Sequence, residues 1–140
     1  MPVPHYTPRD RPSVLIVDDY ADAREVLSIL LKNAGFDVIT AATGPEALAA
    51  ALAEIPSVVL MDLGLPGMSG TDVARTLRAR GDMTDVRLVA VTGCSDPAEL
   101  EIARMAGFDS ILIKPCAPPL LIDEINRLLR QADHSEVRRG

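Results

Sequence analysis

The chain has 140 residues, of which 48% are hydrophobic and 24% charged, as is typical of one globular domain with a sizeable core. Its net charge of -6 argues against direct binding to nucleic acid, which depends on clustered Lys and Arg, and no apolar run approaches the roughly 20 residues that cross a bilayer. The two cysteines, Cys94 and Cys116, are too few for a disulfide framework. We therefore expect a cytoplasmic protein that contacts neither nucleic acid nor membrane.

The ends of the chain differ in composition from the middle. The first residues, MPVPHYTPRDRP, are rich in proline and lack the apolar segment of a signal peptide. The last residues, HSEVRRG, are mostly charged or polar. We expect a flexible arm over residues 1–12, one domain over residues 13–132 and a C-terminal tail over residues 133–140.

Apolar runs and helical patterns alternate five times along the domain, which is typical of βαβ units in a parallel sheet. The runs predict strands at residues 13–17, 36–40, 57–61, 87–91 and 110–113. Four of them are continuously apolar, which is typical of strands that are buried on both faces. The run at 36–40 is mixed, and we expect it at an edge of the sheet.

Apolar side chains at helical spacing predict a helix after each strand. The first helix ends before Gly35, and its predicted inward residues are Ala23, Val26, Leu27, Leu30 and Leu31. The second begins at Thr43, which has capping-box spacing to Glu46, and its predicted inward residues are Ala47, Leu48, Ala51, Leu52 and Ile55.

Three further helices are predicted along the rest of the domain. The third is expected from near Ser69 to about Gly81, and the fourth between a cap at Asp96 and a stop at Gly107. The fifth follows two prolines and ends by Ala132, and its inward residues are Leu121, Ile125, Leu128 and Leu129. Right-handed crossovers then predict a doubly wound, five-stranded parallel sheet between two layers of helices, an α/β fold.

Polar residues end four of the predicted strands, where open α/β sheets bind ligands. Asp18 and Asp19 end the first strand, Asp62 the third, Thr92 the fourth and Lys114 the fifth. Three carboxylates this close repel one another unless a cation shares the site, and Mg²⁺ prefers such oxygen ligands. The turn VDDYAD also lacks the glycine-rich loop that cradles a dinucleotide phosphate. The pattern predicts a magnesium site.

Within this site, Asp62 is a candidate nucleophile that accepts a phosphoryl group. The Lys114 ammonium and the Thr92 hydroxyl could each meet an oxygen of that group. Singly, each residue has a structural explanation: an aspartate can form a turn or cap a helix, a threonine can satisfy loop amides, and a lysine can extend from a strand end into water. Five such residues at one edge favour the functional interpretation.

The segments VDDY, MDLGLPGMSG, VTG and IKP resemble the signature positions of the response-regulator receiver domain of two-component signalling. The resemblance covers roughly residues 13–131 and implies the flavodoxin-like strand order 2-1-3-4-5. It implies that Asp62 is the phospho-acceptor, and that Asp19, Asp62 and the backbone carbonyl of Gly64 bind Mg²⁺ directly. Asp18 would act through a water molecule, and Mn²⁺ could substitute for the magnesium.

The resemblance also implies the roles of the other residues and of partners. Lys114, whose bond to Pro115 would be cis, pairs with the phosphate, and Thr92 donates a hydrogen bond to it. A histidine kinase or histidine phosphotransfer protein would supply the phosphoryl group. Phosphorylation would change the surface of the fourth helix, fifth strand and fifth helix, which binds a downstream protein. We expect a monomer or phosphorylation-dependent dimer, without separate turnover of a substrate.

The sequence departs from the family pattern at three positions. Ile111 stands where the family commonly has an aromatic residue that turns inward, so an aromatic switch is absent there. Gly64 and Cys94 occupy the two variable positions that, in the family, influence how long the phosphoryl group survives. The small Gly64 leaves room for water but offers no side chain to orient it.

Several alternatives remain open at this stage. The receiver could be a stand-alone regulator, a phosphorelay shuttle or a module excised from a hybrid kinase. A magnesium-dependent aspartyl-phosphate phosphatase would carry a second acid two residues after the nucleophile, where this chain has Gly64. A flavin binder would need aromatic side chains, which make up only 3% of the residues.

Overall fold

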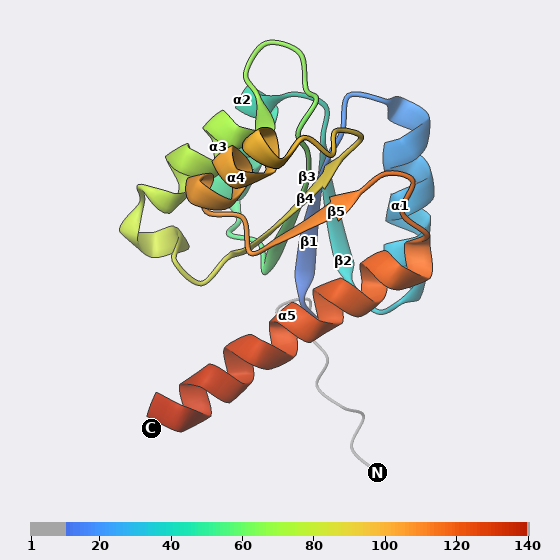
Figure 1. Cartoon of the computed structure of the whole chain (residues 1–140). Coiled ribbons are helices and arrows are strands. Elements are labelled where there is room, and N and C mark those ends of the chain that lie inside the picture. Colours follow the sequence, from blue (N-terminus) through green and yellow to red (C-terminus); the bar gives the residue numbers. More distant parts are fainter. Residues whose placement is uncertain (1–10, 140) are drawn as a thin grey trace.

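The computed structural model describes residues 11–139, and residues 132–139 by their backbone alone. Its sheet is parallel, with the order β2-β1-β3-β4-β5 (Figure 1). The strands are β1 (Ser13–Val17), β2 (Asp37–Ala41), β3 (Val58–Asp62), β4 (Arg87–Thr92) and β5 (Ser110–Ile113). The predicted fold class and strand order are thus confirmed. The arm predicted over residues 1–12 falls almost entirely outside the described residues.

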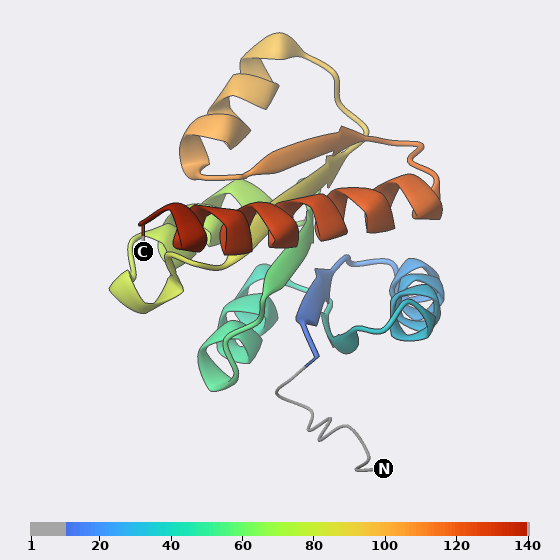
Figure 2. The same ribbon diagram turned by 90° about the horizontal axis from the view of Figure 1, so that it is seen from below.

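Helices cover both faces of the sheet, as predicted. They are α1 (Ala21–Asn33), α2 (Gly44–Ala53), α3 (Gly70–Arg78), α4 (Pro97–Ala106) and α5 (Pro118–Arg139), with a 3-10 turn, η2 (Gly81–Met83), after α3. Helices α2, α3 and α4 cover one face, and α1 and α5 cover the other (Figures 1 and 2).

Two helix ends differ from the prediction. Helix α3 ends at Arg78, before the predicted Gly81, because the chain tightens there into the 3-10 turn. Helix α5 runs to Arg139, past the predicted end at Ala132, so most of the expected tail continues the helix. No glycine or proline lies between these two positions, and the sequence therefore contains nothing that would stop the helix.

The core is built by the alternation of side chains along the central strands. In β1, Val14 and Ile16 pack with the core beneath α1 and α5, whereas Leu15 and Val17 pack with the core beneath α2, α3 and α4. All four side chains are almost completely buried. Continuous apolar runs are needed here because both faces of the strand are covered.

The edge strands are less buried than the central ones. Strand β2 pairs only with β1 and is mixed in sequence, which confirms the predicted edge. Strand β5, read as buried on both faces, is the other edge: it pairs only with β4, and its residues are half-buried or exposed. That prediction was wrong because an apolar run does not reveal whether a strand has one neighbour or two.

Helix caps follow the sequence closely. Thr43 Oγ1 accepts a hydrogen bond from the Glu46 amide at 3.2 Å, and Glu46 accepts one from the Ala42 amide at 3.1 Å. Ser69 caps α3 by accepting a hydrogen bond from the Asp72 amide, and Asp96 caps α4 by accepting one from the Ala98 amide. Among residues 11–139, no helix has both the length and the apolar character needed to cross a membrane.

An ion pair within α5, whose carboxylate also contacts β5, predicts a pH dependence of stability. Glu124 accepts hydrogen bonds from Arg127 Nε and Nη2 at 2.6 and 2.7 Å, and another from the Ser110 hydroxyl. The Arg127 hydrogen bonds, opposed by desolvation and aided by Ser110, lower the pKa of Glu124 from 4.5 to about 2. Its stabilising contribution is therefore complete above about pH 4.5 and is lost as the pH falls towards 2.

Glu124→Gln should consequently lower the free energy of unfolding by about 1 kcal/mol at pH 7. The loss is no larger because solvent screens the partly exposed Glu124–Arg127 pair. The difference from the wild type should shrink steadily in urea unfolding curves measured from pH 5 down to pH 2. A difference that stayed constant over this range would contradict the assignment.

Candidate functional site

The pairing of β1 with β3 brings the acidic residues together. Val17 lies beside Met61 in the register of these two neighbouring strands. The residues that follow, Asp18 and Asp62, therefore emerge at the same edge of the sheet although they are far apart in sequence. Asp19 follows at the start of the loop that leads into α1.

Three carboxylates meet at this edge, as predicted. One oxygen each of Asp18, Asp19 and Asp62 lies within 4.8 Å of the other two. Asp18 is buried and its Oδ1 accepts a hydrogen bond from the Tyr20 amide at 2.9 Å, whereas Asp19 is exposed. Three negative charges at such separations repel strongly without a shared cation.

Asp62 is held through both of its carboxylate oxygens. Oδ1 accepts a hydrogen bond from the Gly64 amide at 2.8 Å, and Oδ2 lies 3.1 Å from Lys114 Nζ. The Asp62 side chain is only 13% exposed, while that of Lys114 is 43% exposed. The Lys114–Pro115 bond is cis, as the resemblance implied. These contacts fix the orientation of the Asp62 carboxylate. Within the described part of the chain, Lys114 supplies the only ammonium group among its hydrogen-bond partners.

Thr92 ends β4 next to this carboxylate and is buried. Its Oγ1 accepts a hydrogen bond from the Cys94 amide at 3.0 Å, so the hydroxyl proton remains available to a further acceptor. Thr92, Asp62 and Gly64 line a common cavity of about 510 Å³ between α3 and α4. A second cavity, of about 500 Å³, lies on the α1 and α5 side and is lined by Asp62, Lys114 and Asp18 together with mostly apolar side chains.

The structure adds residues that the sequence did not single out. Arg24 Nη1 donates a hydrogen bond at 2.8 Å to the carbonyl of Asp18 and so fixes the acidic turn from the first turns of α1. Ser69, Arg75 and Glu99 line the first cavity beside Asp62. The sequence marked Ser69 and Glu99 only as signals of a helix start and did not mark Arg75, because all three reach the cavity through the packing of α3 against α4.

The departures from the family pattern have clear environments. Ile111 is half-buried and packs against the core beneath α2, α3 and α4. Both cysteines are free, and a hydrogen bond with Glu99 raises the pKa of the Cys94 thiol. This direction favours the protonated thiol over the thiolate, which is the reactive form.

Gly70 connects the packing of α3 to the position of Asp62. A Cβ atom at Gly70 would lie 2.7 Å from Met61 Cγ and 2.9 Å from the Asp62 carbonyl oxygen. Gly70→Ala should therefore destabilise the fold by about 2 kcal/mol, although alanine normally favours a helix. Gly81→Ala is the matched control, since nothing lies within 4 Å of its Cβ position. Urea unfolding of both variants tests this, and equal stabilities would contradict it.

Residues 14–126 match the response regulator receiver domain. The chain belongs to this family. It is 37% identical over 123 residues to the DNA-binding response regulator MtrA of Mycobacterium tuberculosis, an alignment that covers 88% of this chain and 53% of that protein. It is 34% identical over 128 residues to the transcriptional regulatory protein GltR of Pseudomonas aeruginosa, with 91% and 53% covered.

The fold agrees with solved receivers. The chemotaxis response regulator CheY4 of Vibrio cholerae superposes with a TM-score of 0.80 at 30% identity, over 84% of this chain and 98% of that one. The receiver spans about half the length of the curated relatives it matches. DNA binding is named for MtrA as a whole, so the absence of direct nucleic-acid contact in this receiver stays a prediction.

Receiver domains are signalling domains of two-component systems, in which response regulators take phosphoryl groups from histidine kinases. The family uses Mg²⁺ at a cluster of aspartates, and the group of Asp18, Asp19 and Asp62 is a cluster of this kind. The five predicted strand-end residues are therefore found at one edge, with Asp62 at the boundary of two cavities.

Proposed function

We propose that this receiver accepts a phosphoryl group on Asp62 from a histidine kinase or histidine phosphotransfer protein. The observation that carries the proposal is the fixed Asp62 carboxylate, which lies 3.1 Å from Lys114 Nζ and within 4.8 Å of two further carboxylates. A nucleophile, a cation and a set of metal ligands thus occupy one edge of the sheet. Each is needed to transfer a group that carries several negative charges.

The donor set fits Mg²⁺. Carboxylate oxygens of Asp19 and Asp62 and the carbonyl of Gly64 would bind the ion, and Asp18 would bind through water, because Mg²⁺ keeps several water ligands. Oxygens around one Mg²⁺ lie about 3 to 4 Å apart, which is close to the 4.8 Å limit of this cluster. When bound, Mg²⁺ neutralises the charge that develops on the phosphoryl oxygens.

The protein's own groups then perform the transfer. An oxygen of Asp62 forms a bond to phosphorus as the bond from phosphorus to the histidine nitrogen of the donor breaks, and the imidazole leaves with a proton from solvent. Lys114 exchanges its contact with Asp62 for one with a phosphoryl oxygen, and the Thr92 hydroxyl donates to another. Gly64 keeps the carboxylate oriented through its amide.

The output surface follows from the position of Thr92 at the start of the loop into α4. A phosphoryl group that draws Thr92 inward shifts the equilibrium of this loop and of the face formed by α4, β5 and α5. The elements of that face expose large apolar side chains, namely Met105, Ile113 and Leu120. Exposed apolar residues at one face are a common feature of protein-binding surfaces, which supports a protein partner here.

Incubation with acetyl phosphate and Mg²⁺ tests the proposal. We expect one added phosphoryl group, which hydroxylamine removes, as it does from an acyl phosphate, and which chelation of the metal prevents. Mass spectrometry of the intact protein measures both. Steady release of phosphate without a labelled protein would instead indicate a phosphatase, and no reaction at all would refute the receiver chemistry.

A further inference from the structure

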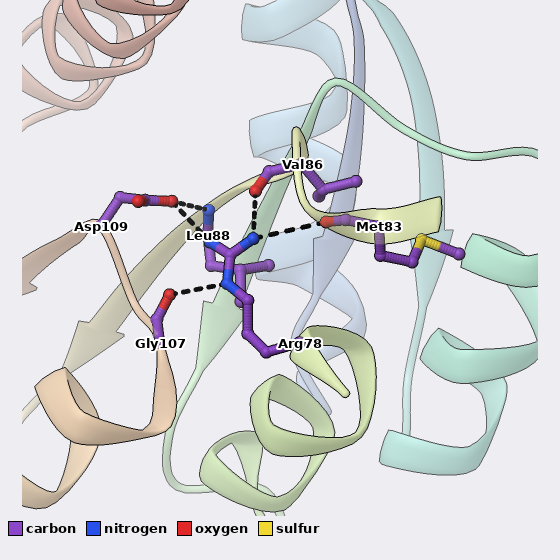
Figure 3. A network of polar contacts seen from close by, with 6 residues as sticks. All are labelled: Arg78, Met83, Val86, Leu88, Gly107 and Asp109. Atoms are coloured by element: carbon purple, nitrogen blue, oxygen red, sulfur yellow. Dashed lines mark hydrogen bonds and ion pairs between the residues drawn. The ribbon is translucent and has the colours of Figure 1, made fainter. Parts of the chain in front are cut away.

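One arginine joins three segments at the end of the sheet opposite the site. Arg78, the last residue of α3, donates from Nε to the Gly107 carbonyl at 3.0 Å and from Nη1 to the Val86 carbonyl at 2.7 Å (Figure 3). Its Nη2 lies 2.8 Å from Asp109 Oδ2, and Nη1 also reaches the Met83 carbonyl at 3.4 Å. A charged donor satisfied at this many acceptors is a strong and well-oriented contact.

The acceptor of this ion pair is fixed as well. Asp109 Oδ2 accepts a hydrogen bond from the Leu88 amide at 2.8 Å (Figure 3). The Asp109 amide in turn donates to the Leu88 carbonyl at 2.8 Å. Leu88 belongs to the start of β4, and Asp109 comes directly before β5. The contact therefore ties the entry of the short edge strand β5 to its neighbour β4.

Gly107 gives this arrangement little freedom. It ends α4 with a φ of +112°, a conformation that favours glycine, and a Cβ atom there would lie 2.6 Å from Arg78 Cγ. The arginine stem thus rests directly on the glycine backbone. We call Arg78, Gly107, Asp109 and the Leu88 backbone the Arg78 clamp.

The other end of α4 lies beside the site, and the hydrogen bond of its cap is local: Asp96 Oδ1 accepts from the Ala98 amide at 3.0 Å. The residues of its first turn, from Pro97 to Glu99, are exposed. Beneath the helix is the cavity of about 510 Å³ that separates it from α3 and that Asp62 and Thr92 also line. Thr92 and the clamp lie at opposite ends of β4, about 13 Å apart at 3.3 Å per residue from Leu88.

We propose that the Arg78 clamp is a fixed pivot for α4. On the proposed function, on which this inference rests, a phosphoryl group at Asp62 moves Thr92 and the loop after it. The N-terminal end of α4 can then move over the cavity, whereas its C-terminal end stays attached to α3 and β4. Arg78 is therefore a positioning residue that confines the response to the half of α4 nearest the site.

Amide hydrogen exchange followed by NMR on the full chain tests the pivot. Without activation, Arg78→Gln should accelerate exchange at Leu88 and residues 107–110 by about tenfold or more. The variant releases the Gly107 carbonyl and the Asp109 carboxylate, which accepts from the Leu88 amide, and so loosens the whole segment. With beryllofluoride and Mg²⁺ as the phosphoryl mimic, the wild type should respond at residues 92–101 but not at 103–109. In Arg78→Gln the response should extend to residues 103–109.

Arg80→Gln is the matched control, since Arg80 makes a half-exposed surface pair with Asp82 at 3.1 Å and should leave all these amides unchanged. If Arg78→Gln does not fold, Asp109→Asn keeps an acceptor for the Leu88 amide and should give a smaller effect at the same positions. Equal exchange in wild type and variants, or a wild-type response along all of α4, would overturn the pivot alone. If beryllofluoride changes no amide in the wild type, both the pivot and the proposed function are contradicted.

Discussion

Asp62→Asn is expected to abolish phosphoryl labelling by acetyl phosphate and Mg²⁺ while the protein stays folded. The amide lacks the negative charge and the nucleophilic oxygen that attack phosphorus. Its oxygen can still accept the hydrogen bond that Gly64 donates to Oδ1 at 2.8 Å. The lost pair with the partly exposed Lys114 should cost no more than about 1 kcal/mol. Intact-mass spectrometry measures the label, and circular dichroism confirms the fold.

Asp72→Asn is the matched control for this variant. Asp72 lies in the first turn of α3 and lines the same cavity as Asp62, but it is exposed and pairs only loosely with Arg75 at 3.7 Å. It should be labelled like the wild type. A hydroxylamine-sensitive label that persisted in Asp62→Asn would move the acceptor to another carboxylate of the cluster.

The second large effect is that of Asp19→Asn on the free energy of unfolding, and its sign should depend on whether Mg²⁺ is present. An ion that binds only the folded protein stabilises it by about 1.4 kcal/mol at ten times its dissociation constant. Asp19→Asn removes a charged ligand and should weaken Mg²⁺ binding about tenfold. At the same Mg²⁺ concentration, about 0.4 kcal/mol of this stabilisation then remains. In a chelator, the same variant should equal or exceed the wild type in stability, because it relieves repulsion among three clustered carboxylates.

Urea unfolding with Mg²⁺ and with chelator measures both effects. Asp22→Asn is the control, since it removes the same charge three residues away, in the first turn of α1 and outside the cluster. Any effect of Asp22→Asn on the helix should be equal in the two conditions. If Asp19→Asn kept the full gain from Mg²⁺, Asp19 would not be a ligand.

Much of the fold could be predicted because local signals and tertiary structure agree. Apolar runs marked every strand, and caps such as Thr43 and Asp96 marked helix starts. The predictions of inward-facing helix residues were wrong at several positions. Val26 and Leu52 have the spacing of inward residues but are exposed, because α1 and α2 lie on the sheet along narrower stripes than their apolar patterns. Ile55 is exposed because α2 ends at Ala53, before this predicted inward position.

The site residues could be predicted because each one ends a strand or directly follows one, and the ends of parallel strands meet at one edge. Their hydrogen bonds could not be predicted in the same way. The contact of Arg24 with Asp18, and those of Arg78 with Gly107 and Asp109, depend on how long side chains cross between elements. No spacing in the sequence encodes such a crossing. The roles of Asp62, Lys114 and Thr92 in phosphoryl transfer stay predictions until labelling is measured.

The strand order has a consequence for the timing of activity during synthesis. The acidic residues and the lysine emerge from strands that are first, third and last in the sequence, so ligands and ammonium meet only after the final strand has docked. Contacts between such distant segments form late in folding, because closing long loops costs entropy first. A partly folded receiver, in which β5 has not docked, therefore lacks the contact between Lys114 and Asp62 on which the proposed phosphoryl transfer depends.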